Sequence, residues 1–302
     1  MRRIVLVLAL VVAATLPVLA QPDPGQLTAE QQRQIAEWEA FLANIDWTFE
    51  GDTGFMGDQA QIDVPPGYAF TGPQGTKELM SAFGNLISEE ELGFVAPRRQ
   101  PDEVDFDWFA VFEFSDSGYV KDDDKDDLDA AEMLRVMREA EIQANEERRR
   151  LGYDTLSITG WAIKPRYNES THNLEWAMNL TSGEGGALVN LNTRLLGREG
   201  VMRVTLVCDP EDLEATIPEY QAMLRDFSFQ PGHRYAEYRR GDKVAKYGLA
   251  GLVVGGGVAA LAKTGLLKKL LKPILVGLLA LAAFLRRIFG GGKTKTEGGE
   301  IA

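Results

Sequence analysis

The chain has 302 residues and a formal net charge of −13, but its charges are unevenly distributed. Residues 1–20 carry two arginines and no acid, and residues 243–302 carry ten basic residues against two acidic ones, so residues 21–242 hold a net charge of −23. A surface this acidic is repelled by nucleic acid, so DNA and RNA are not expected partners. Cys208 is the only cysteine, which excludes an intramolecular disulfide and requires the hydrophobic core to stabilise the domain.

The N-terminus has the pattern of a bacterial export signal. Arg2 and Arg3 precede an uninterrupted apolar run from Ile4 to Leu16, and small residues follow as far as Ala20. The run is shorter than the roughly 20 residues that span a bilayer, so it is typical of a signal peptide. We therefore predict that residues 1–20 are a signal peptide cleaved after Ala20, with an uncleaved N-terminal anchor as the alternative.

The C-terminal part predicts a membrane anchor over residues 243–292, followed by a polar tail over 293–302. Gly248 to Ala262 provides fifteen apolar residues and Ile274 to Leu285 provides twelve, so neither reaches the roughly 20 residues of a relaxed span. A single span that extends the first stretch to Leu267 places all the basic residues beyond it in the cytoplasm, as the positive-inside rule favours. A hairpin of two spans stays open. Either arrangement places the acidic domain outside a bacterial inner membrane, with membrane lipid and another envelope protein as the expected partners.

The first half of the acidic domain mixes helices and strands. Thr28 and Gln31 have the spacing of a capping box, and apolar residues at near-helical spacing follow them. The alternating segment DWFAVFEF predicts a half-buried strand over residues 107–114. In chain order we predict a helix over 29–45, a strand in QIDVPPGYAFTG interrupted at Pro65 and Pro66, a helix over 77–83, the strand at 107–114 and a charged helix over 126–150.

The second half is richer in strands. Four β-prone runs, LSITGWAIKP, LEWAMNLT, GALVNLNTRLL and VMRVTLVC, are separated by turn-forming clusters, which predicts an antiparallel meander. Asp209 as N-cap and Pro210 at the first helical position then predict a helix. Its residues Leu213, Ile217 and Tyr220 share one face, so the helix is expected to lie across the sheet, and FSFQPG closes the domain as a strand. The fold class is α+β, an antiparallel sheet with packed helices.

Several separate segments resemble one known family. The segments GYAFTG, DWFAVFEF with GYVKDDDK, GWAIKPRYNESTHNLEWAMNL and VNLNTRLLGREGV resemble, in order and spacing, the bacterial domain-of-unknown-function 2167 family. This resemblance covers nearly all of residues 27 to 290 and implies an exported, membrane-tethered protein without an established activity. Residues 155 to 230 are also similar, more weakly, to the PsbP-like sandwich, a likeness of fold that says little about function.

The region 161–176 gathers aromatic and cationic side chains on two strands and their turn. His172 lies in the turn NESTHN and is a candidate general acid or base, oriented by one of the carboxylates of Asp122, Asp123 and Asp124. The alternative is a turn histidine that hydrogen-bonds to backbone. The other members of this group are Trp161, Lys164, Arg166, Tyr167 and Trp176, of which Trp161, Tyr167 and Trp176 are candidate ligand-binding residues.

Two further groups are polar. Asn190, Asn192, Arg194 and Arg198 could lie on one edge, where two guanidiniums could hold an anion, although pairing with the domain's carboxylates is the alternative. The segment KDDDKDD, residues 121–127, offers oxygen ligands for a divalent cation, but it lacks the spacing and the glycine of a calcium loop, so a solvated helix start is favoured. One cysteine and two histidines do not make a zinc site, so no metal and no cofactor is expected.

Two function classes follow from these residues. A binding or scaffolding module at the membrane is favoured, because no nucleophile motif, metal set or phosphate loop is recognisable. An extracytoplasmic enzyme is the alternative. It would use His172 with nearby carboxylates, or Arg194 and Arg198 as an anion site.

Overall fold

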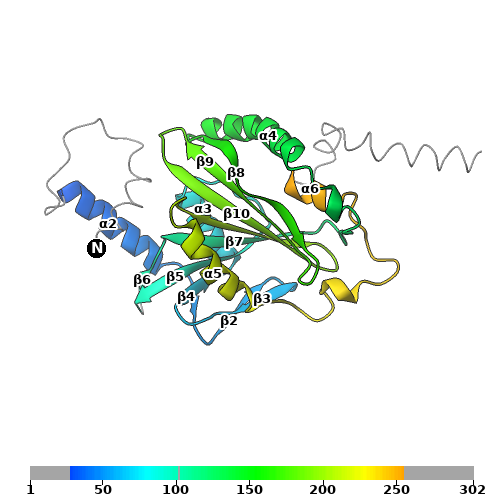
Figure 1. Ribbon diagram of the computed structural model, residues 1–302. Helices are drawn as coiled ribbons and strands as arrows, with labels where there is room; N and C mark the ends of the chain where they lie inside the picture. The colour runs from blue at the N-terminus through cyan, green and yellow to red at the C-terminus, as the bar shows by residue number, and fades with distance from the viewer. Residues whose placement is uncertain (1–27, 101–102, 255–302) are drawn as a thin grey trace, which may run out of the picture.

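A computed structural model of the chain describes residues 28–100 and 103–254 (Figure 1). The predicted signal peptide and most of the predicted anchor lie outside the described residues. Within these residues, the structure has one antiparallel sheet of nine strands and a smaller sheet of three strands, with helices packed against them. The predicted class, an antiparallel sheet with packed helices, is confirmed.

The first helix begins as the sequence predicts. Helix α2 (Ala29–Ala43) starts after Thr28, whose hydroxyl accepts a hydrogen bond from the Gln31 backbone at 3.2 Å. The Gln31 side chain accepts one from the Thr28 backbone at 2.9 Å, which completes the capping box.

Later helices begin at positions that the sequence only approximates. Helix α3 (Pro73–Ala82) starts four residues before the predicted 77, because Pro73 occupies a first-turn position where its missing N–H costs nothing. Helix α4 (Ala130–Arg150) starts behind the capping carboxylate of Asp129, and a separate 3-10 turn, η2 (Lys125–Asp127), precedes it.

The predicted start of the next helix is wrong. Helix α5 (Leu213–Leu224) begins behind Asp212 rather than Asp209, and Asp212 makes no side-chain capping bond. Asp209 and Pro210 lie in the connection after the preceding strand. The predicted apolar face does pack inward, and Tyr220 is fully buried on it.

The large sheet has the strand order β1-β4-β5-β7-β11-β10-β9-β8, and β6 pairs with β5. All its pairs are antiparallel. Its strands are β1 (Trp47–Phe49), β4 (Tyr68–Thr71), β5 (Glu91–Gln100), β6 (Glu103–Val104), β7 (Trp108–Ser115), β8 (Leu156–Asn168), β9 (Asn173–Ser182), β10 (Ala187–Leu196) and β11 (Val201–Cys208). The predicted meander is confirmed as β8 to β11.

The smaller sheet has the order β12-β3-β2 and contains β2 (Thr53–Met56), β3 (Ala60–Asp63) and β12 (Phe227–Phe229). The segment around Pro65 and Pro66 therefore does not form one interrupted edge strand, because the two prolines separate strands of different sheets. The predicted closing strand, β12, pairs with β3 rather than with the meander.

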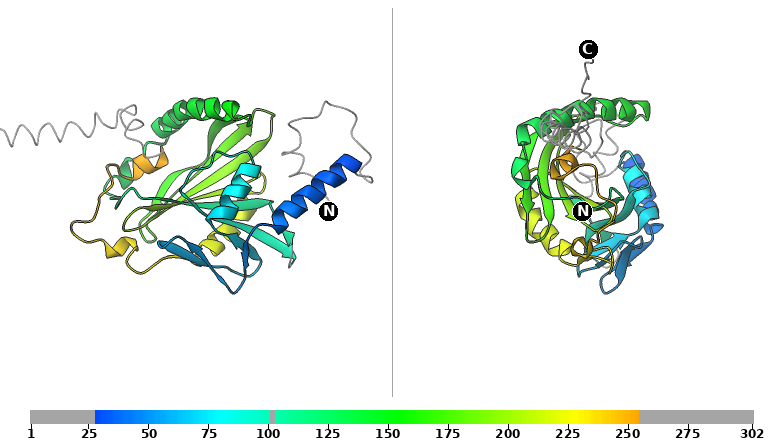
Figure 2. Two further views of the ribbon diagram at one scale, coloured as in Figure 1. Left: turned by 180° about the vertical axis from the view of Figure 1, so that it is seen from behind. Right: turned by 90° about the vertical axis from the view of Figure 1, so that its right-hand side faces the viewer.

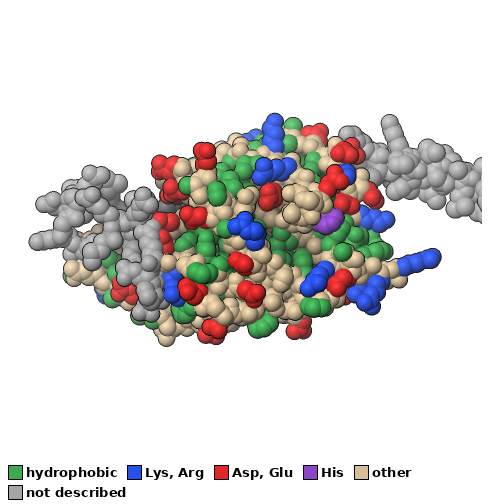
Figure 3. Space-filling model, turned by 60° about the horizontal axis from the view of Figure 1, so that its bottom comes forward, with side chains coloured by type: hydrophobic (Ala, Val, Ile, Leu, Met, Phe, Trp, Pro, Cys, Tyr) green, Lys and Arg blue, Asp and Glu red, His purple; other side chains and the backbone are tan. Residues whose placement is uncertain are grey.

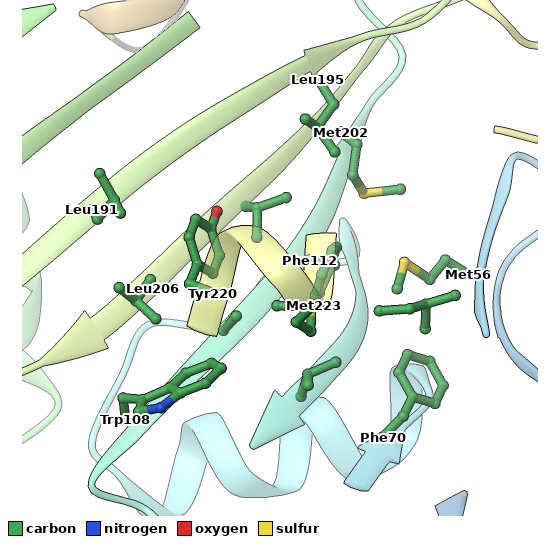
Figure 4. Packing of buried hydrophobic residues seen from close by; sticks show 14 of the residues in the cluster. Met56, Phe70, Trp108, Phe112, Leu191, Leu195, Met202, Leu206, Tyr220 and Met223 are labelled. Carbon is green, nitrogen blue, oxygen red and sulfur yellow. The ribbon is translucent and has the colours of Figure 1, made fainter. Parts of the chain in front are cut away.

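The main core lies between the large sheet, α5 and the smaller sheet (Figure 4). Alternate residues of β7, β10 and β11 point into it, and Tyr220 and Met223 of α5 pack over them. The Tyr220 hydroxyl donates a hydrogen bond to the Thr193 hydroxyl at 2.8 Å, so its polar end is satisfied. Cys208 is buried in this core, where burial raises the pKa of its thiol to about 12.

The opposite face of the large sheet carries two separate apolar clusters. Helix α4 packs on β8, and with Trp161, Leu174 and Trp176 it builds the cluster at one end. Helix α3 packs on β5, and with α2 it builds the other cluster around Phe94. Seen along the molecule, α4 and α3 stand on either side of a concave sheet face (Figure 2).

The segment that enters the predicted anchor is part of this folded unit. Val244 forms a parallel bridge with Tyr119, and the short helix α6 (Leu249–Val253) is buried together with Val254 in the α4 cluster. The carboxylate of Asp124 accepts hydrogen bonds from the backbone N–H groups of Leu249 and Ala250, at 2.9 and 3.1 Å. Over the described parts of the chain, no helix is long and apolar enough to cross a membrane.

This packing predicts that a fragment ending at residue 254 is more stable than one ending at 242. Residues 21–254 should unfold cooperatively. Removing residues 243–254 should lower the free energy of unfolding by roughly 3 kcal/mol or more, because several buried side chains of α6 are lost. Urea denaturation followed by circular dichroism measures the difference.

In the longer fragment, Leu252→Ala should give an intermediate loss, since it removes one buried side chain of α6. Equal stability of the two fragments would show that α6 adds nothing to the core.

Candidate functional site

A row of polar side chains crosses the concave face of the sheet between the two apolar clusters. Arg194 of β10 lies opposite Arg203 of β11, which lies opposite Glu113 of β7. One step along the same face, Asn192 lies opposite both Trp176 of β9 and Thr205 of β11. Side chains directly opposite one another in antiparallel strands share a face, so these groups form one polar surface.

Arg194 is the centre of this surface. Its guanidinium lies over the Trp176 ring, with 4.6 Å between Cζ and the ring centroid. It donates hydrogen bonds to the Asn192 amide oxygen at 3.2 Å and to the Thr193 carbonyl at 3.3 Å. Arg194 is only 9 % exposed and Trp176 only 1 %. A cation stacked on a tryptophan and bonded to neutral oxygens is held in place without its charge being neutralised.

The charged residues next to Arg194 are held in ion pairs, which Arg194 lacks among the described residues. Arg203 forms ion pairs with Glu90 at 2.6 Å and with Glu113 at 3.0 Å, whereas Arg194 makes no ion pair with a carboxylate of the described residues. Burial and the adjacent Arg203 lower the pKa of Arg194 to about 9. Burial also raises the pKa of Glu113, although Arg203 opposes that effect. Among the described residues, Arg194 is therefore a buried cation without a direct ion pair, and the charge of Glu113 acts on it only without contact.

Several buried polar atoms on the same face of the sheet as this cation have no hydrogen-bond partner within the described residues. They are four side-chain atoms: Trp176 Nε1, Asn190 Oδ1, Arg194 Nε and Arg203 Nε. Three are donors and one, the Asn190 oxygen, is an acceptor. Buried polar groups in folded proteins are nearly always satisfied, so a cluster of four calls for a specific explanation.

The structure places four of the candidate residues predicted from the sequence on one face of the sheet: Asn190, Asn192, Arg194 and Trp176. Arg203 and Glu113 were missed, because only the register between strands shows that they continue the row. The alternation of apolar residues in VMRVTLVC could have placed Arg203 on a different face of the strand from its apolar neighbours. It could not have shown that Arg203 lies opposite Arg194.

Arg198 and Trp161 have other partners. Arg198 lies in the turn after β10, where its guanidinium binds both carboxylate oxygens of Asp242, at 2.7 and 2.9 Å. It therefore does not form a paired anion clamp with Arg194, because the turn carries it away from the strand. The Trp161 indole N–H donates to the Ala130 carbonyl at 3.0 Å, so Trp161 holds the start of α4 on the sheet.

His172 lies at the tip of the β8–β9 hairpin in a cluster of its own. It has a φ of +53°, a left-handed conformation that is uncommon outside glycine. The Tyr167 hydroxyl lies 2.9 Å from Asp122 Oδ2 and 3.1 Å from His172 Nδ1, while His172 Nδ1 is 4.0 Å from Asp122 Oδ2. The His172 ring also packs against Tyr235, with ring centroids 4.7 Å apart.

This arrangement joins three segments rather than activating a nucleophile. Asp122 belongs to the loop before α4, Tyr167 and His172 to the hairpin, and Tyr235 to the C-terminal segment. The Tyr167 hydroxyl has one proton, which the Asp122 carboxylate accepts, so His172 Nδ1 donates to the phenol oxygen. Burial and Asp122 raise the pKa of Tyr167, which keeps the phenol protonated. The predicted neighbourhood of His172 and Asp122 is present, with Tyr167 between them.

A groove of about 1020 Å³ lies between this hairpin and the C-terminal end of α5. Arg166 on its wall is paired with Glu175 at 3.2 Å, and the charged residues that line it are exposed or half-buried. Within the described residues, no group of three His, Cys, Asp or Glu side chains could hold a metal ion.

Fold and site together define a mixed α/β domain with a charged group buried on its main sheet. Residues 49–285 match the family described as "Protein of unknown function (DUF2167)". The match covers more than half of the chain, so the chain belongs to this family. The resemblance predicted from the sequence is confirmed.

Comparisons with individual proteins add little. No curated protein matches the sequence. Among solved structures, the chain is similar to the cyanobacterial PsbP protein (CyanoP) of Synechocystis sp. PCC 6803, with a TM-score of 0.35, 10% identity and coverage of 70% of this chain and 99% of that one. It is also similar to the Ran-binding protein Mog1p of Saccharomyces cerevisiae, with a TM-score of 0.30, 10% identity and coverage of 61% and 95%. Likenesses at these scores carry no conclusion about function.

The environment of Arg194 predicts an unusual stability effect. Arg194→Met should leave the free energy of unfolding unchanged or raise it by up to about 2 kcal/mol, because an unpaired buried charge is replaced by an apolar chain of similar length. Urea denaturation of the full-length protein in detergent measures this.

Arg203→Met is the matched control on the same row. It should lower the free energy of unfolding by about 1 to 3 kcal/mol, since Glu113 loses its partner. If Arg194→Met destabilises the protein as much as Arg203→Met, the charge of Arg194 contributes to the fold and the group is structural.

Proposed function

We propose that this protein is a membrane-anchored extracytoplasmic binding module that holds a small anionic molecule against Arg194. The observation that carries the proposal is the burial of Arg194 on Trp176 without a carboxylate partner. An unpaired buried cation lowers stability, and proteins that retain one generally use it. A bound anion would supply both the counter-charge and the missing acceptors.

The buried atoms without a hydrogen-bond partner indicate which chemical groups the ligand should carry. Arg194 Nε and Trp176 Nε1 are donors, so they favour an anionic oxygen that accepts from both. The Asn190 amide oxygen is an acceptor, which favours a hydroxyl or N–H on the same ligand. A hydroxy acid, an amino acid or a sugar acid combines these groups, whereas a simple inorganic anion offers only the first.

The proposed location rests on the sequence. Residues 1–20 have the pattern of a signal peptide, and the apolar stretches after Val254 have that of an anchor. Because α6 holds Leu249 to Val254 in the domain, the apolar stretch left for crossing begins at Gly255. Membrane lipid is then a partner through the anchor, and another envelope protein is a second proposed partner.

Ligand binding at Arg194 should raise thermal stability. A ligand present at one hundred times its Kd stabilises a folded protein by about 2.7 kcal/mol. We expect lactate, an amino acid such as glycine, and glucuronate to raise the Tm of the full-length protein in detergent, acetate to raise it less, and glycerol not at all. Differential scanning fluorimetry at equal ligand concentrations measures the shifts.

Two arginine variants show where the ligand binds. Arg194→Met should abolish the shifts, whereas Arg166→Met, which changes an exposed ion-paired arginine, should retain them. The proposal fails if no acid of the panel raises the Tm, or if Arg194→Met responds as the unchanged protein does.

The proposed membrane arrangement predicts opposite outcomes for two reporter fusions. Alkaline phosphatase, which is active only outside the cytoplasm, should be active when fused after Val254 and inactive when fused after Ala302. The basic residues near the C-terminus favour the cytoplasmic side. Two active fusions would indicate a hairpin or a tail that never crosses, and two inactive ones would contradict export.

A further inference from the structure

The segment of residues 233–246, here called the basic loop, has the opposite charge to the rest of the domain. It contains five Lys and Arg residues against Glu237 and Asp242, whereas residues 21–242 carry a net charge of −23. The five are Arg234, Arg239, Arg240, Lys243 and Lys246, and all are exposed. Figure 3 shows Lys and Arg side chains gathered at the right-hand end of the molecule, where the yellow and orange segment of Figure 1 lies.

The acidic residues of the basic loop are turned inward. Asp242 accepts hydrogen bonds from the Arg198 guanidinium and from the Arg239 backbone N–H, the latter at 2.7 Å. Glu237 accepts from the backbone N–H groups of Gly232 and Arg234, at 2.8 and 2.9 Å. Both negative charges are therefore engaged within the protein. Lys243 pairs with Asp116 at 3.1 Å, so the positive charge that the loop presents to its surroundings comes mainly from Arg234, Arg239, Arg240 and Lys246.

Apolar side chains are interleaved with the exposed cations. Tyr238 is 38 % exposed and Val244 is 39 % exposed. The Tyr238 ring leans on Tyr119, with centroids 4.3 Å apart, and Tyr119 also stacks on Tyr235 at 4.4 Å. A partly exposed tyrosine among basic residues resembles the side chains that are enriched at membrane–water interfaces.

The position of the loop in the chain selects the partner. Only α6 separates the loop from the apolar sequence that begins at Gly255, and α6 is packed into the domain. We propose that the basic loop binds the anionic headgroups of the membrane in which the chain is anchored, and so fixes the orientation of the domain. The acidic remainder of the domain is repelled by the same surface. The inference rests on the proposed anchor but not on the anion site at Arg194.

Lysine labelling of the full-length protein in lipid nanodiscs tests this inference. We compare discs of phosphatidylcholine with discs that also contain phosphatidylglycerol, and follow acetylation of Lys243 and Lys246 by mass spectrometry. Labelling of both lysines should fall several-fold in the anionic discs. The protection should be lost in about 0.5 M NaCl, which screens exposed charges.

Matched charge reversals identify the surface. Arg239→Glu with Arg240→Glu should abolish the protection, whereas Arg149→Glu with Arg150→Glu, which reverses two exposed arginines at the end of α4, should preserve it. Equal labelling of both lysines in the two kinds of disc would overturn the inference. Co-elution of protein and disc reports the anchor separately, and its failure would overturn both the anchor and this inference.

Discussion

The contact between Asp124 and the start of α6 fixes how the C-terminal segment packs. Its carboxylate takes up the N–H groups of Leu249 and Ala250, which a five-residue helix would otherwise leave unsatisfied. The approach requires glycine at position 248, because a Cβ there would lie 2.5 Å from the carboxylate. Burial of the α6 side chains then completes the apolar cluster beneath α4.

Most of the sheet and the long helix could be predicted from sequence, because alternation and helical spacing are local signals. Strand β5 was missed, since Gly93 and Pro97 interrupt its pattern. The start of α5 was misplaced because Asp209 and Asp212 are equally suited to cap a helix. Helix α6 was assigned to the anchor, because an apolar run looks the same in a buried helix and in a membrane span.

The candidate site was predictable only in part. Trp176 and the pair Asn192 and Arg194 were candidates from the sequence in two separate groups, and the sequence could not show that Arg194 is buried without a carboxylate partner. That depends on Glu113 and Glu90 being taken by Arg203, a pairing of residues about ninety and more positions apart. The acidic run at 121–127 was likewise ambiguous: in the structure Asp122 binds Tyr167 and Asp124 caps α6.

The packing of α6 also determines how the C-terminal segment can move relative to the domain. Many tethered domains are joined to their anchors by flexible linkers, whose length sets how far they reach. Here the chain passes from the Tyr119–Val244 bridge into a buried helix with no loose stretch before Val254. Up to Val254, the C-terminal segment therefore moves with the domain as one body.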